Sequence, residues 1–128
     1  MVKRLTATTL KAWRESTLAE QGGNCALCGL PIRPTDPAVG DHDHGTGQMR
    51  GVLHRSCNAL LGNIENNRKR YGLRDNVQLA QMLKGVVPYI LLRRSDDTPL
   101  YPAHRTEDEK RVLKNKRARE ARAKRKAP

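Results

Sequence analysis

The chain has 128 residues, which suits one small domain with an appended segment. It holds one Trp, three Tyr and no Phe, and 37% of its residues are hydrophobic, so a core can bury little aromatic area. We therefore expect a metal or a partner to help hold the fold together. The net charge of +12, from 25 Lys and Arg against 13 acids, indicates a polyanion such as nucleic acid, with mere solubility as the alternative.

Three features of the sequence limit where the protein works. It contains no apolar run of about 18 residues, so we expect no membrane span, and residues 1–13 lack the apolar core of a secretory signal. Three cysteines cannot all pair with one another, and nothing else indicates an oxidising compartment. The expected location is the cytoplasm.

Hydrophobic periodicity predicts the elements of the first half. A helix, two short strands and a second helix are expected at residues 8–21, 39–42, 48–53 and from about 56. Gly22 and Gly23 should end the first helix, because glycine readily adopts a left-handed backbone. The stretch NCALCGLPIRPTDPA contains a CxxC pair and three prolines, and it predicts a tight knuckle followed by a loop. The glycines of HGTGQ should form the turn between the strands.

The second half continues as helix. Residues 74–85 have helical spacing, with Asp75 as the expected N-cap and Gly85 as the expected stop. The apolar stretch VVPYILLRR is ambiguous, since Pro88 could open a helix or lie on an edge strand. A linker at residues 95–104 follows.

The C-terminal segment is the most basic part of the chain. Thr106 and Glu109 form a capping-box pattern at its start, and residues 110–126 carry ten Lys or Arg against one acid. We interpret this segment as a helix or nascent helix that lies on phosphates, with Lys114 and Arg117 among the DNA contacts. A solvated charged end without a partner is the alternative.

Two pairs of metal-binding residues share one spacing. Each pair has two intervening residues, and the members are Cys25, Cys28, His54 and Cys57. This spacing lets a knuckle turn aim both side chains at one ion, and two such pairs are typical of a structural Cys3His zinc site. A closed zinc site adds folding free energy, on the order of 10 kcal/mol in zinc peptides, which would compensate for the small core. Ordinary buried thiols are the alternative.

A second cluster alternates acids with imidazoles. It consists of Asp41, His42, Asp43 and His44, and Asn58 follows the last cysteine. Carboxylate and amide oxygens suit a hard ion such as Mg²⁺, and a neutral imidazole can take a proton from water at pH 7. In a regular strand Asp41 and His42 point to opposite faces, so their joint action requires the strand to end, bulge or twist there.

At these residues the sequence resembles a known family. The stretches LAEQGGNCALCG and DHDHGTGQMRGVLHRSCNALLG are similar to the bacteriophage recombination endonuclease VII family, a branch of the HNH or ββα-metal nucleases, over about residues 10–65. The resemblance implies that Asp41 and Asn58 hold one divalent ion, Mg²⁺ or Mn²⁺, and that His42 is the general base. The family's usual zinc ligand at the place of His54 is a cysteine, and histidine is chemically competent there.

The resemblance implies metal-dependent hydrolysis of DNA phosphodiester bonds, with branched or distorted DNA as the substrate and a homodimer as the assembly. The second half of this chain does not visibly match the long helical region of the family. A simple HNH nicking endonuclease remains a second interpretation. A third is a non-catalytic zinc module that binds nucleic acid, although such a module gains little from acids facing phosphates.

Five further residues are assigned by the same resemblance or left open. His44 is the rival general base, or else it orients the base or holds a substrate phosphate. Arg50 contacts phosphate or braces the hairpin, and Arg55 is a further expected DNA contact. Some family members carry an acid three positions after the Asn, where this chain has Leu61. Glu65 is the nearest acid and a candidate extra ion ligand.

Together these features predict an α+β fold: a small zinc-stabilised ββα-metal core with an N-terminal helix and a helical, basic C-terminal extension. The expected parts are a nuclease core, a helical extension with a linker, and a DNA-binding tail that is helical or disordered, at residues 1–67, 68–103 and 104–128.

Overall fold

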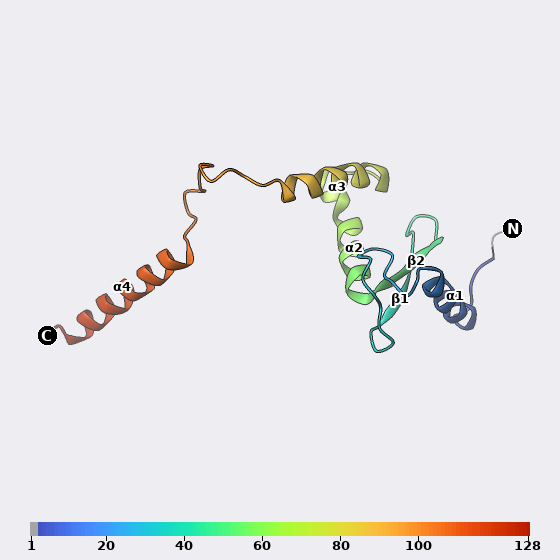
Figure 1. Ribbon diagram of the computed structural model, residues 1–128, viewed down its shortest axis with the longest axis horizontal. Coiled ribbons are helices and arrows are strands. Elements are labelled where there is room, and N and C mark those ends of the chain that lie inside the picture. The colour runs from blue at the N-terminus through green and yellow to red at the C-terminus, as the bar shows by residue number, and fades with distance from the viewer. Residues whose placement is uncertain (1–2) are drawn as a thin grey trace. The chain divides into compact units, whose positions relative to one another are not determined.

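The computed structural model describes residues 3–128 and divides the chain into two compact units, one ending at Ile90 and the other beginning at Leu91 (Figure 1). The elements are α1 (Ala7–Glu20), β1 (Ala38–His42), β2 (Met49–His54), α2 (Arg55–Asn67), the 3-10 helix η1 (Arg68–Tyr71), α3 (Asn76–Leu91) and α4 (Glu107–Lys126). Helices combined with a small two-stranded sheet make the fold α+β, as predicted. The predicted domain break after residue 67 falls inside the first unit, between α2 and η1.

Helix α1 begins and ends close to its predicted limits. The Thr6 hydroxyl accepts a hydrogen bond from the Thr9 backbone N–H, and the Thr9 hydroxyl accepts one from the Thr6 N–H at 2.7 Å. This reciprocal cap satisfies two donors that the first turn leaves unpaired. Gly22 and Gly23 follow the helix with φ values of 68° and 77°, so the predicted glycine stop is confirmed.

Strands β1 and β2 form an antiparallel hairpin on which both α1 and α2 pack (Figure 1). Side chains alternate between its faces. A Cβ at Gly40 would lie 3.0 Å from Met49 Cε and 3.3 Å from Trp13 Cζ3, so Gly40 and Met49 face α1. The next residue on each strand, Asp41 and Arg50, therefore faces α2. The hairpin thus turns its charged pair toward α2, on the face that also carries Leu53.

The turn of the hairpin depends on Asp43. Its carboxylate accepts hydrogen bonds from the backbone N–H groups of Gly45 at 2.8 Å and Thr46 at 2.9 Å. These two bonds hold the pKa of Asp43 below its ordinary value, Thr46 contributing most. Gly47 closes the turn with φ at 76°. The sequence predicted a glycine turn here, and the acid is part of it.

The core of the first unit is small. Its buried cluster consists of Cys25, Ile32, Val52 and Leu53, and Trp13 and Leu61 are among the half-buried residues that pack against it. Val52 is fully buried. The composition predicted this scarcity of apolar burial.

Gln21 fastens the end of α1 to the outer edge of β2. Its amide Nε2 donates to the Val52 carbonyl at 2.9 Å, and its Oε1 accepts from the Val52 N–H at 2.9 Å. The side chain thereby pairs with β2 as a neighbouring strand would, so that buried backbone groups keep their partners. A Cβ at Gly51 would lie 3.2 Å from both Gln21 Oε1 and Ala26 Cβ, so a side chain at this position would press against them.

Helix α3 begins as predicted and ends later than predicted. The Asp75 carboxylate accepts from the Gln78 N–H at 2.9 Å and caps the helix. The predicted stop at Gly85 is wrong, because α3 continues to Leu91 with Pro88 inside it. A single interior glycine costs only about 1 kcal/mol, and the run after Gly85 is apolar. Pro88 therefore neither opens a helix nor lies on a strand.

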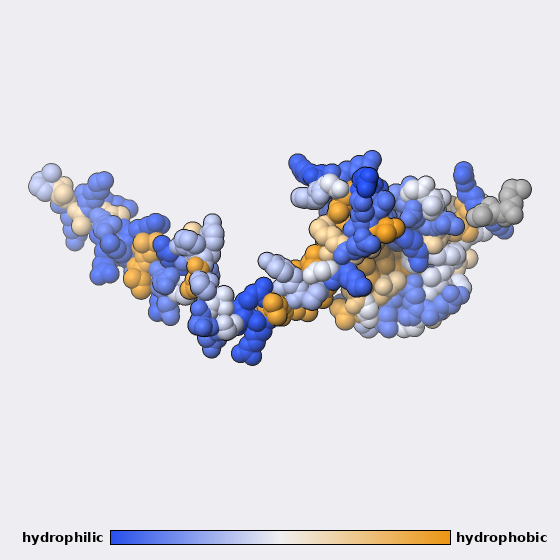
Figure 2. Space-filling view, turned by 90° about the horizontal axis from the view of Figure 1, so that it is seen from above, coloured by the Kyte–Doolittle hydropathy of each residue, from blue (hydrophilic) through white to orange (hydrophobic). Residues whose placement is uncertain are grey.

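The second unit contains a linker and α4. The Thr106 hydroxyl accepts from the Glu109 N–H and the Glu109 carboxylate accepts from the Thr106 N–H, both at 3.2 Å, which confirms the predicted capping box. Figure 2 shows a mostly hydrophilic surface over α4, where Val112 is 62% exposed. Over residues 3–128, no helix is both long and apolar enough to cross a membrane.

Candidate functional site

The four predicted zinc ligands come together. The ligand atoms of Cys25, Cys28, His54 and Cys57 all lie within 4.8 Å of one another. The first two cysteines belong to a knuckle in which the Gly29 N–H donates to the Cys25 carbonyl at 2.9 Å. The other two ligands lie at the end of β2 and in the first turn of α2. The cluster therefore joins the knuckle, the hairpin and α2, and it could hold a zinc ion.

The ring of His54 is oriented for metal binding. Its Nε2 lies 3.1 Å from the carbonyl oxygen of Pro31, and its Nδ1 lies 3.4 Å from Cys28 Sγ and 3.9 Å from Cys57 Sγ. A carbonyl only accepts, so Nε2 must carry the proton. The lone pair of Nδ1 then faces the thiols. Metal-bound histidines commonly donate their second ring N–H in this way, which fixes the tautomer and the ring orientation.

The pKa values of the Cys25 and Cys57 thiols are shifted in opposite directions. Burial acts to raise the pKa of Cys25, but hydrogen bonds from the backbone of Cys28, His54 and Leu27 outweigh it and lower the pKa to about 6. Burial and the neighbouring thiols Cys28 and Cys25 raise the pKa of Cys57 to about 11. Sulfurs held this close resist sharing negative charge unless a cation lies among them. Three thiols and one imidazole are the donor set that zinc prefers.

A buried charge network lies on the face of the hairpin that packs against α2. Asp41 is 6% exposed and Glu65 is 3% exposed, and one guanidinium joins them. Arg50 Nε and Nη2 donate to the two carboxylate oxygens of Asp41 at 2.7 and 3.1 Å. Nη2 and Nη1 donate to the two oxygens of Glu65 at 2.7 and 3.3 Å. Arg50, which was expected to contact phosphate or to brace the hairpin, makes the bracing contacts.

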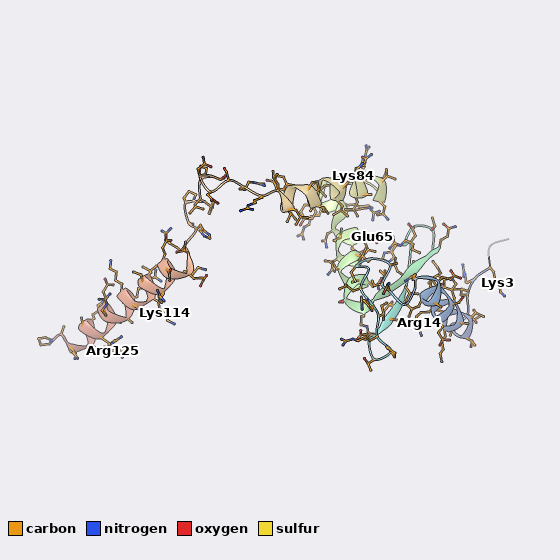
Figure 3. All side chains as sticks on the ribbon, in the orientation of Figure 1. Lys3, Arg14, Glu65, Lys84, Lys114 and Arg125 are labelled. Carbon is orange, nitrogen blue, oxygen red and sulfur yellow. The ribbon has the colours of Figure 1, made fainter. Side chains whose placement is uncertain are left out.

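Helix α3 contributes the fourth member of this network. Asn76 Nδ2 donates to Glu65 Oε2 at 3.0 Å, and Glu65 is labelled on α2 in Figure 3. Hydrogen bonds from Arg50 lower the pKa of Glu65; burial opposes this, and Asn76 adds to the lowering. The two carboxylates in turn raise the pKa of Arg50, Asp41 more than Glu65. Glu65 and Arg50 are therefore both ionised at neutral pH.

His42 and His44 lie just beyond Asp41. The strand pairing shifts register between Asp41, which pairs with Gly51, and His42, which pairs with Met49. The extra residue is Arg50 on β2, so the bulge lies opposite Asp41 and His42, and β1 itself ends at His42. Both histidines are exposed, and their ring centroids are 5.1 Å apart.

His44 also borders a polar cavity of about 340 Å³. The residues around it include Asp43, Glu65, Arg68 and Asn76. The cavity therefore lies between the hairpin turn, α2 and α3.

Asn58 is half-buried in the first turns of α2. It precedes Leu61 by three residues and Glu65 by seven, a spacing that places the three on one helix face. Leu61 and Asp41 border the same cavity of about 250 Å³, so this face lies toward Asp41. Within residues 3–128, the only side-chain partner recorded for Asp41 is Arg50. Asn58 is therefore on the helix face that lies toward Asp41, and within the described residues neither Asn58 nor His42 is hydrogen-bonded to the Asp41 carboxylate.

The remaining predicted DNA contacts are exposed. Arg55 opens α2, and Lys114 and Arg117 lie on α4, where Figure 3 labels Lys114. Neither Gln21 nor Asn76 was predicted from the sequence, and Glu65 was predicted only as an extra ion ligand. Nothing local marks these residues, because their partners lie 11 to 31 positions away in the chain. The only sequence signal is that Gln21 stands inside the LAEQGGNCALCG motif.

A family model described as recombination endonuclease VII matches residues 2–90. The matched span contains the four-residue metal cluster, the hairpin, α2 and most of α3. The second unit, with α4, lies outside it. The match covers well over half of the chain, and it includes every residue of the charge network.

Proposed function

Because this chain belongs to the recombination endonuclease VII family and is therefore a nuclease, we propose that it hydrolyses DNA phosphodiester bonds at the junction of the hairpin and α2. Asp41 and Asn58 would hold one divalent ion, and His42 would act as the general base. The zinc cluster would fix the knuckle and the start of α2, and thereby the position of Asn58.

One observation carries this proposal. Asp41 is a buried carboxylate whose two oxygens are oriented by one guanidinium, and the strand register shifts directly after it. A buried charge is costly, and chains retain it where it has a task. A module that only binds DNA has no evident use for a buried carboxylate such as Asp41 next to the place where it contacts phosphates.

The chain's own groups supply most of the chemistry. His42 is exposed and would take a proton from the attacking water, as a neutral imidazole can near pH 7. The oxygens of Asp41 and Asn58 are the hard donors that Mg²⁺ or Mn²⁺ prefers. When bound, the ion supplies Lewis-acid stabilisation of the negative charge on the phosphate. His44 borders the neighbouring polar cavity and would hold a substrate phosphate or orient His42.

The substrate and the assembly are also part of the proposal. We expect branched or distorted DNA to be cut, in the manner of a junction-resolving enzyme, by a homodimer. Arg55 on α2 and the basic side chains of α4, among them Lys114 and Arg117, would contact phosphates, because ten Lys or Arg on one helix attract a polyanion.

The test uses zinc-loaded protein with supercoiled plasmid and with a four-way junction, each with or without added Mg²⁺. Chelators are avoided because they would also strip the structural site. His42→Ala and Asp41→Asn should lose cutting in Mg²⁺. His104→Ala, a histidine of the linker, is the matched control and should cut like the unaltered chain.

Three outcomes would count against the proposal. Full cutting by His42→Ala would remove its general base. Binding of DNA without cutting in any divalent ion would favour a zinc-bearing binding module. Nicking of plasmid with no preference for the junction would favour a simple HNH endonuclease.

A further inference from the structure

We infer that Glu65 and Asn76 are positioning residues for the nuclease reaction: they hold Arg50, and through Arg50 the carboxylate of Asp41, and they connect the start of α3 to the reaction centre. The inference rests on the proposed role of Asp41 as an ion ligand.

Arg50 uses only part of the acceptor capacity of the Asp41 carboxylate. A guanidinium offers five N–H donors, and Arg50 directs donors to both oxygens of Asp41 and both oxygens of Glu65. Each carboxylate oxygen has two acceptor sites, and Arg50 is the only partner recorded for those of Asp41 within residues 3–128. One acceptor site on each Asp41 oxygen therefore remains available. Paired N–H···O bonds of this kind fix the plane of a carboxylate as well as its position.

Glu65 is better placed to orient Arg50 than to bind an ion itself. Both of its oxygens accept from Arg50, and Oε2 also accepts from Asn76. Its side chain is 4% exposed, against 31% for that of Arg50. Arg50 between two carboxylates cannot turn away from Asp41 without breaking its contacts with Glu65. This assigns Glu65 a role different from the extra ion ligand suggested by the sequence.

Asn76 extends the network to α3. It is the first residue of that helix, and its amide donates to Glu65 Oε2 at 3.0 Å. Leu79, one turn later, is the buried residue of α3. The network therefore connects β1, β2, α2 and α3 through four side chains. Displacement of the start of α3 should loosen Arg50 and thereby alter the orientation of Asp41.

The experiment combines a kinetic measurement of DNA cutting with an NMR measurement that needs no catalysis. Glu65→Gln, Asn76→Ala and Arg50→Lys would be compared singly and in pairs, and Asn67→Ala on α2 and Glu15→Gln on α1 are exposed matched controls. For Glu65→Gln we expect a loss of about 10- to 100-fold in kcat or in apparent Mg²⁺ affinity, as for other residues that orient metal ligands, and a smaller loss for Asn76→Ala. The KM for DNA should change little.

Coupling between the sites distinguishes positioning from direct ion binding. If Glu65 acts through Arg50, the Glu65→Gln and Arg50→Lys double variant should be no worse than the poorer single variant. Losses that multiply would overturn the inference. The NMR resonance of the Arg50 Nε–H, identified by its disappearance in Arg50→Lys, should move in Asn76→Ala and stay in place in Asn67→Ala.

The kinetic and NMR measurements also distinguish failure of the inference from failure of the proposed function. An unaltered chain that cuts no DNA would refute the nuclease proposal, while the Arg50 resonance would still test the network. A chain that cuts normally with Asn76→Ala and Glu65→Gln, and with an unmoved Arg50 resonance, would overturn the inference alone. Asn76→Ala keeps the test open if the buried Glu65→Gln variant does not fold.

Discussion

Cys28→Ser tests whether the metal cluster holds the fold. Cys28 is exposed, so exchanging its sulfur for oxygen removes a metal ligand without opening a cavity in the core. Structural zinc contributes about 10–16 kcal/mol in zinc peptides, against a net stability of about 5–15 kcal/mol for a typical domain. An equal share for one ligand of four is about 3 kcal/mol. In a domain of this size, 1 kcal/mol shifts Tm by about 4–8 °C, so Tm should fall by about 12–24 °C.

The assay uses Trp13, the only tryptophan of the chain, as the reporter. Trp13 packs against the buried cluster that contains Cys25, so its fluorescence follows the loss of this core on heating. Zinc content would be measured by mass spectrometry of the intact protein. Ser56→Ala, between the second pair of ligands, is the control and should keep both its zinc and its Tm. A Cys28→Ser protein, or a zinc-free protein, that melts like the unaltered chain would refute the reasoning.

Three further predictions concern the packing, the charge network and the tail. Gly40→Ala places a methyl group 3.0 Å from Met49 Cε and 3.3 Å from Trp13 Cζ3, and it should lower the free energy of unfolding by about 1–3 kcal/mol in a urea titration. The pKa of Glu65 in the folded state lies below its ordinary value of 4.5, so the Glu65 carboxylate stabilises the fold above that pH, and this stabilisation is lost as the pH falls through the lowered pKa. Glu65→Gln should therefore flatten the acid part of the curve of unfolding free energy against pH. An unchanged curve would contradict this role of Glu65. Removal of residues 106–128 deletes ten of the 25 Lys and Arg. The slope of the logarithm of the DNA association constant against the logarithm of the salt concentration should then become shallower by about 0.9 for each phosphate that α4 neutralises. An equal slope would show that α4 neutralises none.

Local chemistry made part of this protein predictable. The metal ligands could be found because two intervening residues are enough for a knuckle to aim both members of a pair at one point. The capping boxes and glycine stops likewise depend on residues three or four positions apart, as Thr106 and Glu109 show. The stop predicted at Gly85 failed because a favourable apolar run outweighs one weak helix former.

The sequence by itself therefore determined the first helix, the hairpin, the residues of the candidate metal cluster and the basic tail. Only the tertiary structure decided what surrounds Asp41. Arg50 could have pointed to solvent and a phosphate; it lies between Asp41 and Glu65 because α2 packs on that face of the hairpin. Asn76 joins them because η1 brings α3 back to the end of α2. Such contacts depend on how whole elements pack, and no short pattern in the chain specifies that packing.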